Sequence, residues 1–97
     1  MAEQNESVES MENRRKRLKF RAWHRGTREM DLVMGSFADR NLENFGAKEL
    51  EEFENLLTCS DPDVYDWILG RKPVPEEYRS GVMDRLLRHR LGENEAT

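Results

Sequence analysis

The chain has 97 residues, of which 37% are charged and 36% are hydrophobic, and its formal net charge is −4. A chain of this length forms one domain at most, and its small core favours short amphipathic helices over a large sheet. Its one cysteine, Cys59, excludes an internal disulfide and suits a reducing compartment. No apolar run approaches the length of a membrane span, and the first residues lack the apolar region of a secretory signal.

Charge is distributed unevenly along the chain. Residues 1–13 carry four acids and no bases, and residues 14–28 carry eight bases and no acids. Residues 29–97 carry sixteen acids against eight bases. The basic block at residues 14–28 has three interpretations: a solvated helix face, a surface that steers an acidic protein partner, or a segment that neutralises phosphates.

Two helices are expected in the first half of the chain. The first begins near Ser7 to Ser10 and ends near His24 or Arg25, and the second covers about residues 28–42. Gly35 lies inside the second helix, where we expect close helix packing rather than a hinge. The apolar faces of these helices contain Val8, Met11, Leu18, Ala22, Phe20, Trp23, Met30, Val33, Met34 and Phe37.

Three further helices are expected in the second half. The third covers about residues 47–58, and the fourth begins with Asp61 as N-cap and Pro62 at the first helical position. It ends before Gly70, and the fifth helix runs from Pro75 to Gly92. We expect Trp67 to anchor the core, together with Leu50, Phe53, Leu56, Leu57, Val64, Ile68, Tyr78, Val82, Met83, Leu86, Leu87 and Leu91.

The predicted fold is all-α, a compact bundle of five short helices, because no segment of useful length alternates with the period of a strand. The bundle forms a single domain over residues 10–92. Residues 1–9 are expected to be disordered, since they carry little apolar surface, and residues 93–97 are expected to fray.

A tight corner is predicted between the first two helices. Gly26 suits a position just past a helix end, because it takes a positive φ without a Cβ clash. Thr27 then caps the second helix, and Glu29 and Asp31 fall in its first turn, where the macrodipole favours anions. The same residues also have an ordinary interpretation, in which Gly26 is only a cap, Glu29 only a dipole partner, and the arginines only a solvated face.

Two stretches resemble one known family. The motif RGTRE at residues 25–29 resembles the RGxxE signature of the succinate dehydrogenase flavinylation factors, the FAD assembly factors called SdhE in bacteria. The stretch CSDPDVYDW at residues 59–67 resembles the same family in order and spacing, and the resemblance covers about residues 19–91. Such factors are small helical bundles. They bind the flavoprotein subunit of succinate dehydrogenase, in bacteria also that of fumarate reductase, and promote covalent attachment of FAD to one of its histidines.

The resemblance implies a partner-binding site that consists of Arg25, Gly26, Arg28, Glu29 and Asp31. In this interpretation Gly26 allows close backbone approach, and the two arginines supply planar donor forks for carboxylates or carbonyls. Glu29 accepts a hydrogen bond from a basic residue of the partner or holds an arginine in place. Asp31 is a weaker candidate, with the alternative role of a residue that only stabilises the start of the helix. The chain departs from common bacterial members at His24 and Thr27.

The resemblance also sets expectations for cofactor and location. We expect a monomer with no cofactor of its own, which acts on FAD attachment to a partner and does not insert into membranes. The acidic N-terminus argues against a mitochondrial transit peptide, so the expected location is the bacterial cytoplasm.

Catalytic signatures are weak in this sequence. The two histidines, His24 and His89, lie far apart, and no zinc spacing, phosphate-binding loop or dinucleotide glycine pattern occurs. We therefore interpret the chain as a protein that is not an enzyme. The alternative function is a small nucleic-acid-binding or antitoxin-type regulator, which would use the basic first helix with Phe20 and Trp23 for stacking.

Overall fold

The computed structural model describes the backbone of residues 9–96 and the side chains of residues 9–89. Within these residues the backbone forms five α-helices, two short 3-10 helices and no strand, so the all-α prediction is confirmed. Disorder was expected for residues 1–9 and fraying for residues 93–97, and of these residues 1–8 and 97 lie outside the described residues. Glu9 pairs with Arg17, and the backbone of residues 93–96 continues α6. The elements are α2 (Met11–Trp23), α3 (Arg28–Asn41), η1 (Leu42–Asn44), α4 (Ala47–Leu57), α5 (Asp61–Leu69), η2 (Glu76–Tyr78) and α6 (Gly81–Ala96).

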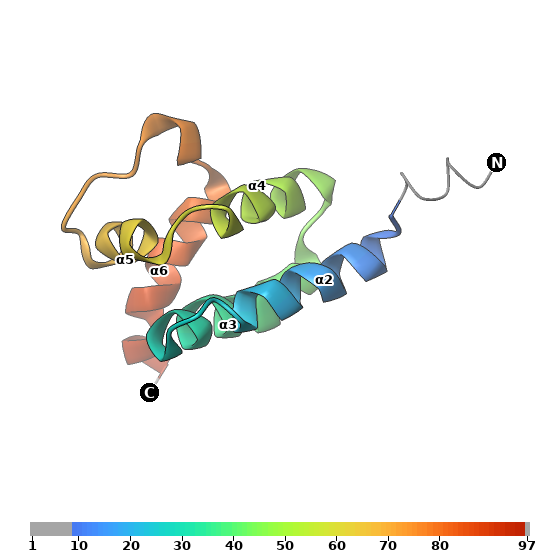
Figure 1. Ribbon diagram of the computed structural model, residues 1–97, viewed down its shortest axis with the longest axis horizontal. Coiled ribbons are helices and arrows are strands. Elements are labelled where there is room, and N and C mark those ends of the chain that lie inside the picture. Colours follow the sequence, from blue (N-terminus) through green and yellow to red (C-terminus); the bar gives the residue numbers. More distant parts are fainter. Residues whose placement is uncertain (1–8, 97) are drawn as a thin grey trace.

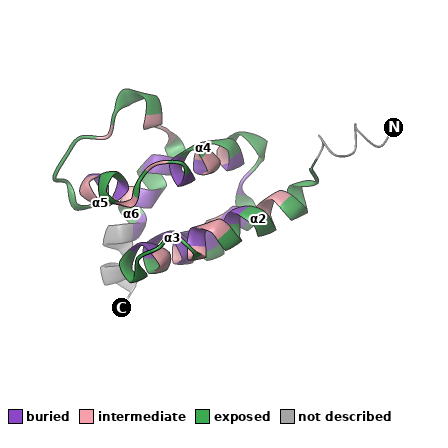
Figure 2. Cartoon of the chain, viewed as in Figure 1, coloured by how far each residue is buried: buried purple, intermediate pink, exposed green. Residues whose placement is uncertain are grey.

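The helices enclose one core. Helices α2 and α3 form an antiparallel pair, α4 and α5 lie across from this pair, and α6 packs against α3, α4 and α5 (Figure 1). Buried residues gather on the inner sides of the helices, whereas the loop between α5 and α6 is largely exposed (Figure 2). The largest fully buried side chains are Phe37, Phe53, Leu18, Met34, Leu42, Leu50, Leu56, Met83, Leu86, Val64 and Val82.

Gly35 lets α2 approach α3 closely. A Cβ atom at this position would overlap the indole ring of Trp23, so the expected close packing is confirmed. The half-buried Trp23 also donates from Nε1 to Asp39 Oδ1 at 3.2 Å. Phe20 was expected on the apolar face, and that prediction is wrong: its side chain is 63% exposed and stacks on the ring of His24. The Cα–Cβ bond of Phe20 points away from the helix face that carries the buried residues Leu18 and Ala22.

Most of the basic block faces acids or carbonyls of the same chain. Arg14 and Arg17 each contact a carboxylate oxygen of Glu54 on α4 at 3.1 Å, and Arg21 contacts it at 3.7 Å. Arg17 also pairs with Glu9 at 2.8 Å, and this hydrogen bond lowers the pKa of Glu9. Burial alone would raise the pKa of Glu54, but hydrogen bonds from Arg17 and Arg14 outweigh it, so the pKa lies below its ordinary value.

Arg15 closes the turn after α3. It donates from Nε to the carbonyl of Leu42 and from Nη2 to that of Phe45, both at 2.8 Å. These carbonyls belong to η1 and to the residue that follows it, and the Leu42 carbonyl also accepts from the Phe45 N–H at 3.2 Å. The arginine that interrupts the apolar stripe of α2 is therefore a structural link to the α3–α4 connection.

The predicted start of the fourth helix is one residue late. Ser60, not Asp61, is the N-cap of α5, and its Oγ accepts from the backbone N–H of Asp63 at 3.4 Å. Asp61 is the first helical residue, and Pro62 follows it. Serine and aspartate are both good caps. Ser60 takes the cap position because the Asp61 carboxylate accepts from the guanidinium of Arg25 instead.

The predicted bounds of the fifth helix are also wrong. Pro75 begins only the single 3-10 turn of η2, and α6 begins at Gly81, where Ser80 Oγ accepts from the Met83 N–H at 3.0 Å. At its other end α6 continues beyond Gly92 to Ala96. A glycine ends a helix when its backbone turns left-handed, and its presence alone does not force that turn.

The Glu54 cluster generates a stability prediction. Because the pKa of Glu54 is lower in the folded chain, its contribution is present above its ordinary pKa of 4.5 and is lost as the pH falls through the lower folded value. We expect Glu54→Gln to reduce the free energy of unfolding at pH 7 by about 1 kcal/mol. The difference from the unmodified chain should shrink below pH 4.5 in urea titrations. Glu51→Gln, at an exposed position of the same helix, is the control, and equal losses in both variants would contradict this account.

Candidate functional site

The corner between α2 and α3 has a fixed backbone. Gly26 has φ +126°, so the prediction of a positive φ is confirmed, and Thr27 Oγ1 caps α3 by accepting from the Met30 N–H at 3.2 Å. Asp31 Oδ1 accepts from the N–H of Arg25 at 2.5 Å and from that of Gly26 at 3.2 Å. A Cβ at Gly26 would meet nothing within 4 Å. Glycine is therefore required by the backbone conformation and not by crowding.

The side chain of Arg25 points into the molecule. Its guanidinium reaches Asp61 Oδ1 from Nε at 2.8 Å and from Nη2 at 2.7 Å. It also donates to the backbone carbonyls of Leu57 and Cys59, both at 2.6 Å. The side chain is only 8% exposed. The donor fork that was expected to face a partner is thus used within the chain, where it joins the end of α4 to the start of α5.

Arg28 and Glu29 are placed differently. Both are exposed in the first turn of α3, and neither side chain makes a hydrogen bond or ion pair with any described residue. Leu32 follows at helical spacing and is 52% exposed. The corner therefore divides its charged residues into two groups. Arg25 and Asp31 hold the backbone, while Arg28 and Glu29 present both signs of charge to solvent.

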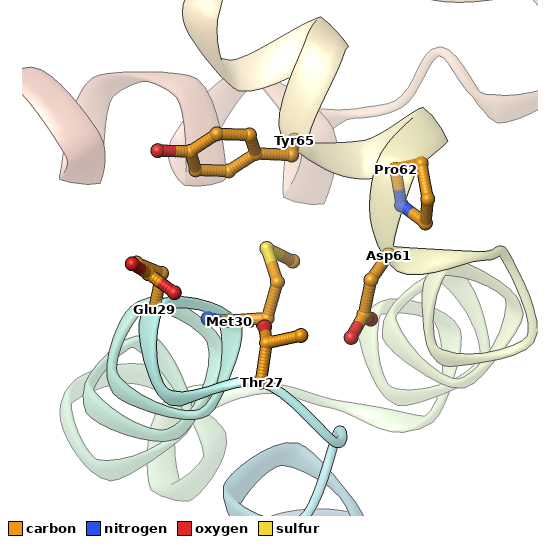
Figure 3. Close-up of a pocket in the computed structure, with 6 residues that line it drawn as sticks. All are labelled: Thr27, Glu29, Met30, Asp61, Pro62 and Tyr65. Carbon is orange, nitrogen blue, oxygen red and sulfur yellow. Dashed lines mark hydrogen bonds between the residues drawn. The ribbon is translucent and has the colours of Figure 1, made fainter.

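A pocket of about 290 Å³ opens beside these exposed residues, between the start of α3 and the start of α5. Met30 points from α3 toward α5, and Tyr65 extends over the opening (Figure 3). Glu29 and the Tyr65 hydroxyl lie on one side of the pocket, with Asp61 and Pro62 on the other. The pocket is lined by Thr27, Glu29, Met30, Asp61, Pro62 and Tyr65. It thus combines residues from both stretches that carried the family resemblance.

The histidines and the cysteine do not converge. His24 stacks on Phe20, while His89 is buried and its Nε2 lies 2.9 Å from Ser36 Oγ. The Cys59 thiol donates to the Asn55 carbonyl at 3.7 Å. Among the side chains of residues 9–89, no group of three or more histidines, cysteines and acids is arranged to hold a metal ion. His89 is the ninth residue of the sixteen-residue α6, so it lies near the middle of the helix and not in its last turn.

The basic block does not form an open phosphate-binding surface. Of its eight bases, six contact an acid or a backbone carbonyl of this chain, namely Arg14, Arg15, Arg17, Lys19, Arg21 and Arg25. Lys16 and Arg28 are the two without such a contact among the described residues. The block holds helices together, which weakens the nucleic-acid alternative.

Comparison with known proteins identifies the family. The model of the Sdh5 family, described as flavinator of succinate dehydrogenase, matches residues 16–90, which include both stretches and the whole corner. The chain belongs to this family. The resemblance seen in the sequence is thereby confirmed for α3, α4 and α5, and for most of α2.

Several relatives of this family are similar along most of the chain. The chain is 46% identical over 74 residues to the FAD assembly factor SdhE of Acetobacter pasteurianus, which covers 76% of this chain and 68% of the relative. It is 36% identical over 85 residues to the mitochondrial succinate dehydrogenase assembly factor 2 of Dictyostelium discoideum, covering 88% of this chain. It is 35% identical over 83 residues to assembly factor 2-A of Drosophila yakuba, covering 84% of this chain. The chain spans only 60% and 51% of the lengths of these two mitochondrial relatives.

Sequence reasoning identified the corner but missed its neighbours. Asp61 was interpreted only as a helix cap and Pro62 only as the first helical residue, and Tyr65 had no assigned role. All three lie in the stretch at residues 59–67 that resembles the family. That stretch was the available signal. The structure explains why this stretch matters, because Asp61 and the Cys59 carbonyl accept hydrogen bonds from the buried guanidinium of Arg25.

The two arginines of the corner should differ sharply in their effect on stability. Arg25→Gln leaves Asp61 and two carbonyls without their donor in a largely buried site, so we expect a loss of about 3 kcal/mol in the free energy of unfolding. Arg28→Gln removes an exposed, unpaired charge and should change it by less than about 0.5 kcal/mol. Urea titration measures both values. Similar losses in the two variants would show that the buried fork has no special structural role.

Proposed function

We propose that this chain is an assembly factor that binds the flavoprotein subunit of succinate dehydrogenase and promotes covalent attachment of FAD to it. The observation that carries the proposal is the exposed pair Arg28 and Glu29, held on a fixed backbone without partners among the described residues. Membership of the flavinator family and the similarity to an SdhE protein support it.

In this proposal the corner residues have two kinds of role. Arg28 and Glu29 contact the partner, since they offer a planar donor fork and a carboxylate acceptor side by side. Opposite charges on neighbouring residues match a complementary pair in a single orientation, which fixes the register of docking. Arg25, Gly26 and Asp31 act as positioning residues, because their hydrogen bonds and backbone conformation stay inside the chain.

The proposed mechanism requires no catalytic group of this chain. A protein that binds one conformation of its partner better than others increases the population of that conformation. If the favoured conformation aligns the partner's histidine with its flavin, the attachment becomes faster, because alignment removes much of the entropic barrier. We propose that the chain acts as a monomer, is not an enzyme, has no cofactor of its own, and serves the fumarate reductase flavoprotein as well. The bacterial cytoplasm stays a prediction.

The exposed pair provides the direct test. Arg28→Gln and Glu29→Gln should each weaken partner binding by about tenfold, since each removes one charge-assisted contact. With the helper limiting, covalent flavin on the coexpressed flavoprotein should fall, as measured by fluorescence of the denatured subunit in a gel. Glu76→Gln, an exposed acid of η2 away from the corner, is the control. Full fluorescence with the double variant would remove the pair from the site.

Glycine substitutions test the role of the corner backbone. Gly26 and Gly70 both have positive φ, and neither has an atom within 4 Å of an added Cβ. Alanine therefore introduces backbone strain of about 1–3 kcal/mol at either position without a side-chain clash. Gly26→Ala should reduce flavin attachment, because the strain distorts the segment that carries Arg28 and Glu29. Gly70→Ala, at the end of α5, should not, and equal effects would contradict the proposed site.

A further inference from the structure

A second concave site lies between the C-terminal half of α3 and the first half of α6. Its volume is about 240 Å³, and its lining residues are Arg40, Asn41, Arg85, Arg88 and His89. Arg40 is twelve residues beyond Arg28 on the same helix, which places it about 18 Å along the axis from the corner. This pocket shares no residue with the pocket beside the corner.

The three arginines of this pocket are exposed and lack acidic partners. No carboxylate of a described residue lies within ion-pair distance of Arg40, Arg85 or Arg88. The setting makes this unusual, since residues 29–97 carry twice as many acids as bases. Asp84 lies four residues before Arg88 on α6, a spacing that permits a pair, yet the two do not pair. Positive charge is thus concentrated on one concave surface of an acidic chain.

His89 lines the pocket and is held in place by neighbouring side chains. Its side chain is 9% exposed, its Nε2 lies 2.9 Å from Ser36 Oγ, and its ring meets that of Phe37 edge-on at 5.5 Å. Asn41 is also held, since its Nδ2 donates to the Phe37 carbonyl at 2.9 Å. Two of the five lining side chains are therefore held in place by contacts with the bundle itself.

Helix electrostatics explain only one of the three arginines. Arg40 lies in the last turn of α3, where the macrodipole favours a cation. Arg85 and Arg88 are the fifth and eighth residues of the sixteen-residue α6, so they lie between its first and last turns, where the macrodipole favours neither sign of charge. Their position beside Arg40 has no explanation in local helix stability.

We propose that this pocket binds a phosphate-bearing anion of the diphosphate class. Guanidinium groups bind phosphate oxygens in a bidentate manner, and several converging forks select a compact anion with more than one charge. The small volume of the pocket, about 240 Å³, favours such a compact ligand over an extended acidic peptide. This site goes beyond the proposed function, because it neither includes the corner nor depends on docking of a flavoprotein.

Titration of the full chain with pyrophosphate tests the site, with chemical shifts of the backbone amides as the readout. We expect saturable shifts that are largest around Arg40 and Arg88. Arg85→Gln and Arg88→Gln should each weaken binding by about tenfold, since each removes a charge-assisted contact. Arg79→Gln is the matched control, because Arg79 is exposed, has no ion pair among the described residues, and lies outside this pocket.

Three further probes separate the possible ligands. Equal affinity for ADP supports an esterified diphosphate, and weaker affinity supports the free anion. Tighter binding of polyglutamate than of pyrophosphate would overturn the proposal in favour of an acidic protein segment. So would the absence of saturation up to about 10 mM pyrophosphate, or an equal weakening in Arg79→Gln. Thermal unfolding of each variant shows whether a lost affinity is a lost fold.

Discussion

One buried guanidinium connects the two parts of the chain that define its family. Arg25 lies in the corner after α2, and it donates to Asp61 and to the carbonyls of Leu57 and Cys59 across the junction of α4 and α5. The planar guanidinium has five N–H donors in fixed directions, whereas a lysine ammonium has only three on a single nitrogen atom. The corner, the α4–α5 junction and the pocket between them therefore depend on the same residue.

This interaction explains why the charged corner separates into a buried and an exposed half. With Arg25 turned inward and Asp31 bound to the backbone N–H groups, the chain enters α3 along one path. Arg28 and Glu29 then fall on the outer side of the first turn. For the proposed docking surface this rigidity is an advantage, because little conformational entropy would be lost when a partner binds.

The parts of this structure that the sequence predicted well depend on local interactions. The cap at Thr27 and the positive φ of Gly26 each follow from the chemistry of one residue and its neighbours. The close packing at Gly35 was also predicted, although its partner Trp23 lies on another helix. The inward turn of Arg25 could not be predicted in this way, since Asp61 is thirty-six residues away. The late start of α6 has the same origin, because Tyr78 packs its ring against Trp67 before the helix begins.

Hydrogen–deuterium exchange of the chain alone and in complex with a succinate dehydrogenase flavoprotein subunit tests the central claim most directly. The amides of residues 26–32 should become protected in the complex, because the outer side of this turn is the proposed contact. Peptides from α4, which carries none of the proposed contact residues, should be unchanged. Protection confined to α4 or to η2, with the corner exchanging as in the free chain, would contradict the account.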